Sequence, residues 1–191
     1  IELMNENKEM RLMMQEQQKQ MSEILPKIGN NNTTNNKFNI MVFLNEKCKN
    51  AISMTQFIEK IEISMKNLLT TKDKGLSEGI SNIIIDNMNQ LSLYERPLHC
   101  TDKKRETLYI KNDEWQKDER KELMNDLLKK VEHKQMKNIK QWTDEHPNYM
   151  DDEKLQDEYI NLVRKCTSSV EECKNKVIKK VCDNVYLTDK E

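Results

Sequence analysis

Length, composition and charge restrict the architecture of this chain before any motif is considered. Its 191 residues suffice for one head domain and a short extended element, but not for two large domains. Charged residues make up 34% of the chain and hydrophobic residues 36%, a balance that favours exposed helices over a thick core. The formal net charge of -1 excludes a histone-like polycation, and the 3 glycines are too few for β-sandwiches or phosphate-binding loops. We therefore expect a mainly α-helical protein.

The first element in the chain has the pattern of a coiled coil. A 3-4 spacing of mostly apolar residues defines a seam of Leu3, Asn7, Met10, Met14, Gln17, Met21 and Ile24. A polar Asn at an a position is a known device for fixing register and oligomer state. We expect residues 1–28 to join the chain to itself as a dimer or trimer. A single amphipathic helix docked on the head is the alternative, because polar seam residues and flexible methionines make a weak zipper.

A polar tether is expected after the coil. Pro26 cannot continue a helix, and residues 29–37 are rich in Asn and Thr with no apolar residue to bury. From Phe38 to Leu44 a period-two pattern of aromatic and β-branched residues predicts a short strand. This strand would open a helical head that spans residues 38–147.

Two core helices are predicted in the first half of the head. Ser53 and Gln56 have the spacing of a capping box, which starts a helix whose apolar residues continue to Leu69. A second pattern begins at Leu76 and ends before Pro97. The two should form an antiparallel helical hairpin. The isoleucine run 83–85 would also fit a buried strand, but its flanking residues favour helix.

The second half of the head combines a β-hairpin with a charged helix. Short β-prone runs around the turn 101–106 predict a hairpin near residues 98–111. Asp113 and Asp118 offer caps for a helix that runs to about Trp142. Pro147 separates this helix from a C-terminal helical pair, residues 148–191, with helices from Asp151 to about Cys166 and from Val170 to about Leu187. The expected core anchors of the head are Tyr109, Trp115 and Trp142.

The residues with reactive side chains do not predict a catalytic or metal site. His99 and Cys100 are adjacent on a predicted strand, so their side chains point to opposite faces and cannot act as base and nucleophile together. The 5 cysteines show no CxxC pair and no zinc-ligand spacing. We expect five reduced thiols, no catalytic residue, no metal and no cofactor.

Three basic residues lie at the predicted hairpin turn. Lys103, Lys104 and Arg105 could contact phosphates of a nucleic acid, with a nearby aromatic ring stacking on a base. Acidic residues on both sides of the three neutralise part of this charge, so a solvated turn is the favoured interpretation.

Several stretches resemble an uncharacterised protein family of large DNA viruses. The two stretches are FNIMVFLNEKCKNAISMTQFIEKI and GLSEGISNIIIDNMNQLSLYERPLHCTDKKRETLYIKNDEWQKD. The most distinctive part of the second stretch is RPLHCTD, which is followed by KR and Tyr109. The similarity runs from Met10 to about Pro147. Family members often carry a zinc-finger-like segment before the coil, and because this sequence begins with Ile1, such a segment could lie upstream.

The resemblance implies a viral setting and assigns no catalytic residue. We expect a viral structural or assembly protein that homo-oligomerises through the coil and presents its head to other virion proteins. The alternative is a nucleic-acid-binding regulator that the coil dimerises. No apolar run approaches the roughly 20 residues of a membrane span and no signal peptide is recognisable. The expected location is the host cytoplasm or the virus particle, without membrane attachment.

Overall fold

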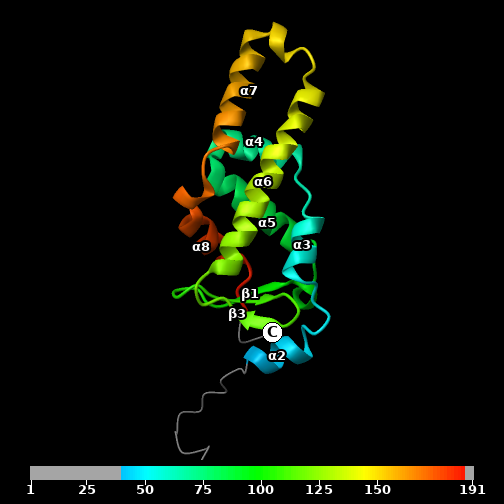
Figure 1. The fold of residues 1–191 in the computed structure, drawn as a ribbon, viewed down its shortest axis with the longest axis vertical. Coiled ribbons are helices and arrows are strands. Elements are labelled where there is room, and N and C mark those ends of the chain that lie inside the picture. Colours follow the sequence, from blue (N-terminus) through cyan, green and yellow to red (C-terminus); the bar gives the residue numbers. More distant parts are fainter. Residues whose placement is uncertain (1–39, 188–191) are drawn as a thin grey trace, which may run out of the picture. The chain divides into compact units, whose positions relative to one another are not determined.

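The computed structural model describes residues 40–187. This part of the chain is mainly helical and contains one small three-stranded antiparallel sheet (Figure 1). The predicted coiled-coil seam from Leu3 to Ile24, the tether at 29–37 and the start of the predicted strand at Phe38 lie outside the described residues.

The elements follow one another in a fixed order along the chain. The helices are α2 (Ile40–Glu46), α3 (Met54–Lys60), α4 (Met65–Lys74), α5 (Leu76–Asn89), α6 (Glu122–Glu145), α7 (Glu153–Cys166) and α8 (Lys174–Asn184). The strands are β1 (Leu98–Asp102), β2 (Thr107–Lys111) and β3 (Trp115–Lys117). Three short 3-10 turns are η1 (Leu93–Glu95), η2 (Tyr149–Asp151) and η3 (Val170–Glu172).

The first prediction after the tether is wrong, because residues 40–46 form a helix and not a strand. Alternating residues would share one face of a strand, whereas the buried side chains of α2 are the adjacent Phe43 and Leu44. Met41 and Val42 are exposed on the same helix. Packing of one helical face against the sheet has therefore overridden a local pattern that favoured extended backbone.

The predicted first core helix starts where expected but is divided in two. Ser53 Oγ accepts the N–H of Gln56 at 3.1 Å and Gln56 Oε1 accepts the N–H of Ser53 at 3.0 Å, so the capping box is confirmed. Extended backbone at residues 61–64 then separates α3 from α4. Ser64 caps the start of α4 with Asn67, and on α5 the side-chain amide of Asn87 donates to the carbonyl of Glu62 and accepts its N–H, both at 2.9 Å.

The predicted helical hairpin is confirmed by α4 and α5, which pack against each other. They are joined at Gly75, whose φ of +90° suits glycine because it has no Cβ. The run 83–85 lies within α5, so the alternative strand is wrong.

The predicted β-hairpin is confirmed, and a third strand extends it. The sheet order is β1-β2-β3, with His99 opposite Tyr109 and Tyr109 opposite Lys117. The third strand begins at Trp115 and has only three residues. Its other neighbour is α2, which contacts it directly.

The sheet has two buried faces with different surroundings. Leu98 and Cys100 point into the main core, which α3, α5, α6 and α8 complete. His99 lies on the opposite face, close to Phe43 of α2 and to Trp115. The prediction that His99 and Cys100 point to opposite faces is confirmed.

The charged helix α6 and the two C-terminal helices also form near their predicted positions. Asp118 caps α6 as predicted, since its carboxylate accepts the N–H groups of Leu123 at 3.3 Å and of Met124 at 2.9 Å. The last helix ends at Asn184, earlier than predicted, because residues 185–187 pair with β1 instead. Figure 1 shows α6 and α7 running side by side away from the sheet.

Candidate functional site

The face of the sheet away from the main core carries the most distinctive chemistry in the described residues. Here α2 covers an apolar group that we call the α2 cluster, and its buried members are Phe43, Leu44, Cys48, Ala51, Trp115 and Leu187. Tyr109 is half-buried against it. The fold therefore brings together segments that are far apart in the sequence, because α2, the sheet and the segment after α8 all contribute residues to this cluster.

A histidine and a cysteine meet inside this cluster. His99 is fully buried, its ring centroid is 5.5 Å from that of Trp115, and its Nε2 lies 3.8 Å from Cys48 Sγ. His99 Nδ1 has no hydrogen-bond partner in the structure. The cysteine that meets His99 is thus Cys48 and not the neighbouring Cys100, a contact between positions 51 apart that no local spacing could indicate.

The electrostatics of this pair oppose nucleophilic catalysis. Burial, together with a smaller effect of the nearby Arg96 charge, lowers the pKa of His99 to about 4. Burial raises the pKa of Cys48 to about 11, against a smaller opposing effect of Lys111. Near neutral pH both groups are uncharged, whereas an activated cysteine needs its thiolate. The pair is therefore a packed, neutral contact.

Beside the α2 cluster the surface is hollowed. A depression of about 330 Å³ lies between α2 and the β2–β3 turn, and its lining residues are Met41, Asn45, Lys49, Lys111, Asp113, Glu114 and Trp115. Lys111 Nζ donates to the carbonyl of Lys49, which ties the sheet to the end of α2. The charged groups around the depression have both signs, so they favour neither anions nor cations.

Exposed apolar side chains border the same region. On α2, Met41 is 37% exposed and Val42 46%, and Tyr94 of η1 is 47% exposed. The Tyr94 ring lies 6.3 Å from the ring of Phe43, so η1 and α2 are neighbours. We call Met41, Val42 and Tyr94 the α2 patch. Exposed apolar side chains on α2 and on the neighbouring η1 can take part in contact with another protein.

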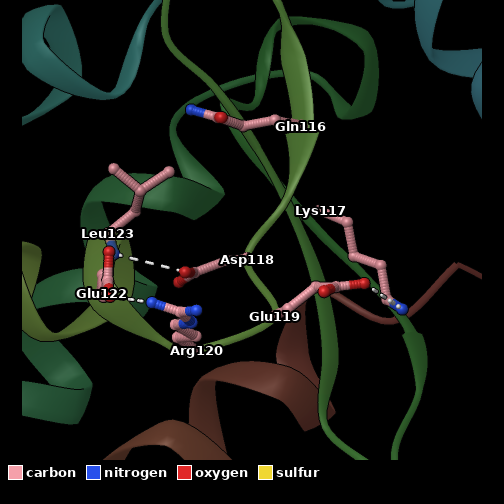
Figure 2. A pocket seen from close by; sticks show the side chains of 7 residues that line it. All are labelled: Gln116, Lys117, Asp118, Glu119, Arg120, Glu122 and Leu123. Carbon is pink, nitrogen blue, oxygen red and sulfur yellow. Dashed lines mark hydrogen bonds and ion pairs between the residues drawn. The ribbon is translucent and has the colours of Figure 1, made fainter.

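A second depression, of about 440 Å³, lies where β3 leads into α6. Figure 2 shows its lining, in which Asp118 points to the start of α6 and Lys117 reaches Glu119 at 3.1 Å. Arg120 also lies 3.9 Å from Glu122. The polar groups here either accept hydrogen bonds from the start of α6 or form exposed ion pairs with each other. We therefore assign them a structural role.

The predicted basic tip is a tight turn held by an acidic residue. One oxygen of Asp102 accepts the backbone N–H groups of Lys104 at 2.9 Å and Arg105 at 3.0 Å. These hydrogen bonds, above all the one from Arg105, lower the pKa of Asp102. The Arg105 guanidinium also lies 3.8 Å from the Asp102 carboxylate.

Lys103 of the same tip turns toward the end of the chain. Its ammonium group lies 3.9 Å from Asp183 of α8 and 4.7 Å from the centroid of the Tyr186 ring. Two of the three predicted phosphate contacts are thus engaged within the protein. A nucleic-acid contact at this tip stays a prediction.

Replacing Lys103, Lys104 and Arg105 together by alanine should lower the free energy of unfolding by less than about 1 kcal/mol. The reason is that their ion pairs are exposed to solvent, where such pairs contribute little. Urea unfolding measures this change. If the tip does bind nucleic acid, the same variant will lose affinity for all sequences alike and show a weaker salt dependence.

The three predicted core anchors do not form one site. Tyr109 and Trp115 both belong to the α2 cluster, whereas Trp142 lies on α6 and packs with residues of α4 and α7 in a separate cluster. There it stacks on His146 with ring centroids 4.2 Å apart and contacts Tyr149 and Tyr159. These rings hold the α6–α7 pair together.

Two further findings apply to residues 40–187 only. No three or more His, Cys, Asp or Glu side chains are placed there to hold a metal ion. No helix in that part of the chain has the length and apolarity that crossing a membrane requires.

In comparisons with protein-family models, curated proteins and solved structures, no match to the chain was found.

Proposed function

We propose that this chain is a structural or assembly protein that self-associates and presents its helical head for contact with other copies. The observation that carries the proposal is the exposed α2 patch, Met41, Val42 and Tyr94, at the start of the head. The viral setting comes from the sequence resemblance alone and is part of the same proposal. The occupant we assign to the patch is the same patch on a second copy, as in a two-fold symmetric contact.

The position of the patch in the chain supports this function. Residues 29–37 are the predicted tether and immediately precede the head, and residues 1–28 are the predicted coil. If the coil pairs two chains, a tether of this length keeps their heads at an effective concentration in the millimolar range. A patch of three side chains is too small for a stable dimer of free heads. It is sufficient once the coil has brought the heads together.

The chemistry of the α2 cluster supports binding over catalysis. Its histidine and cysteine are buried and neutral, and their pKa values are shifted away from those of an activated pair. The side chains that remain accessible next to them are apolar or belong to residues of mixed charge. Such a surface can recognise a protein but offers no converging reactive groups.

Light scattering on the full chain and on a version that starts at Asn30 tests the proposal. We expect a dimer or trimer for the full chain and a monomer for the shortened version at micromolar concentration. A monomeric full chain would overturn the proposal. Salt-sensitive retention on DNA, with no defined oligomer, would favour the nucleic-acid-binding regulator instead.

A charge placed on the α2 patch tests the head contact separately. Changing Met41 and Val42 to Glu in the full chain should leave the oligomer assembled but let the two heads separate, because the charges repel across the symmetric contact. Small-angle scattering would then show a larger radius of gyration. The matched control is Ile160→Glu, since Ile160 is 61% exposed on α7, outside the patch. An unchanged radius in the Met41/Val42 variant would contradict the patch contact.

A further inference from the structure

The outward face of α6 carries a row of basic side chains that the proposed function does not use. With 24 residues, α6 is the longest helix in the described part of the chain. Lys130, His133, Lys137 and Lys140 follow one another along it in steps of three and four residues, and all four are exposed. Such steps place side chains on one face of a helix. We call these four residues the α6 stripe.

The contacts of α6 with the head fix the direction in which the stripe points. On the opposite face of the helix, Val131 and Ile139 are buried. On the flank between the two faces, the ammonium group of Lys134 donates to the carbonyls of Glu59 at 2.8 Å and Ile61 at 3.2 Å. These contacts set the rotation of α6 about its axis, so the stripe faces solvent.

The charges of the stripe are only partly neutralised. Lys130 forms an exposed ion pair with Asp126 at 2.7 Å. Within residues 40–187, the ammonium groups of Lys137 and Lys140 make no ion pair or hydrogen bond. Asp126 and Asp144 lie on the same face, one helical turn before and one turn after the stripe, and no acidic residue separates them on this face.

Two acidic residues on the η3 side of α6 are occupied by other groups. The carboxylate of Glu132 accepts the N–H of Val170 at 2.7 Å. Glu171 of η3 forms ion pairs with Lys129 at 3.4 Å and with Lys174 at 2.8 Å. The stripe is therefore a local concentration of positive charge in a chain whose formal net charge is -1.

We propose that the α6 stripe binds the phosphate backbone of a double-stranded nucleic acid without reading its sequence. From Lys130 to Lys140 the stripe covers about 15 Å of the helix axis. Phosphates of one strand recur about every 3.4 Å along the axis of a duplex, so the stripe is long enough to contact several of them. Lysine ammonium groups and an imidazole N–H both donate hydrogen bonds to phosphate oxygens.

The composition of the stripe favours nucleic acid over a protein or a membrane. Lysine is depleted at protein–protein interfaces, where aromatic residues and arginine contribute most of the binding energy, and the stripe contains neither. A helix that lies on a membrane exposes apolar side chains beside its cations, whereas the apolar face of α6 is buried in the head. This binding goes beyond the proposed self-association and does not depend on it.

Fluorescence anisotropy with the full chain and a labelled DNA duplex, several helical turns long and of arbitrary sequence, tests the inference. We expect a dissociation constant in the micromolar range at low salt and a linear fall of log affinity with log salt concentration. Changing Lys130, Lys137 and Lys140 to Gln should weaken binding at least about tenfold and reduce the salt slope by about 2–3. Glutamine has a helix propensity close to that of lysine, so α6 should be retained. Arginine at the same positions should keep the affinity.

A matched control removes the same charge elsewhere. Lys154, Lys176 and Lys179 are exposed on α7 and α8, and changing all three to Gln should leave the salt slope unchanged. An equal loss in the control and the stripe variant would overturn the inference, because binding would then follow the overall charge. An unchanged slope in the stripe variant would overturn it too, including the case in which the alanine variant of the hairpin turn loses binding instead.

Two further probes at the same ionic strength separate the possible partners. They are vesicles that contain phosphatidylserine and a polyglutamate peptide. We expect binding that depends on the stripe for the duplex only. If either probe bound the unchanged chain as tightly as the duplex and lost this affinity in the stripe variant, the nucleic-acid assignment would be wrong.

Discussion

Replacing Trp115 by alanine should lower the free energy of unfolding by about 3–5 kcal/mol. Trp115 is the first residue of β3, is only 6% exposed and contacts His99 through its ring. Its indole N–H donates to the buried carbonyl of Cys48 at 3.3 Å. Truncation therefore leaves a cavity in the α2 cluster and removes the hydrogen bond to that carbonyl. Urea unfolding followed by circular dichroism measures the loss.

Two controls separate packing from the hydrogen bond. Trp115→Phe keeps much of the apolar volume and should lose only about 1–2 kcal/mol, because it removes the indole N–H and part of the ring. Tyr94→Ala truncates an aromatic residue that is already 47% exposed and should cost less than the tryptophan change. If Trp115→Ala cost no more than Tyr94→Ala, the α2 cluster would not be a core of the head.

The elements that the sequence predicted correctly are those with local causes. The capping box at Ser53 acts over three residues, and Asp118 caps a helix that starts a few residues later. The hairpin pairs two strands separated by a short turn, and Gly75 marks the junction between α4 and α5. In each case the residues that determine the structure lie within a few positions of it.

The elements that were missed depend on contacts between distant residues. The break between α3 and α4 is held by Asn87, 25 positions after Glu62, in addition to the local capping box of Ser64 and Asn67. The helical state of residues 40–46 depends on a sheet that forms some 60 residues later, and β3 is too short for a period-two pattern to identify it. The contact of His99 with Cys48, 51 positions away, has the same origin. These distant contacts cannot be found from spacing in the sequence, although Ser64 and Asn67 do have the spacing of a helix start.

The stability of the head should fall by about 3 kcal/mol as the pH falls from 6.5 to 4, because of His99 alone. An ordinary histidine has a pKa of 6.5, and burial lowers that of His99 to about 4. Between these pH values the unfolded chain binds a proton at this position that the folded chain does not. Protons therefore favour the unfolded state, and the contribution is fully present above pH 6.5 and lost as the pH approaches 4.

Two non-titrating replacements isolate this contribution from that of the carboxylates. His99→Phe keeps a ring in contact with Trp115 and Phe43, and His99→Gln keeps a polar side chain of smaller volume. Urea unfolding of each variant and of the unchanged chain is measured in steps from pH 7.5 to 4. As the pH falls over this range, the unchanged chain should lose about 3 kcal/mol of unfolding free energy relative to either variant.

The two replacements need not have equal stability at neutral pH, because they pack differently in the α2 cluster. They must agree in the pH dependence, since each removes the same titrating group from the same buried position. If the difference in unfolding free energy between the unchanged chain and both variants stayed constant with pH, the imidazole would be hydrated in the folded head. In that case His99 Nδ1 would have water as a hydrogen-bond partner, and the contact with Cys48 would not be a buried, neutral one. Helix α2 would then not exclude water from this face of the sheet.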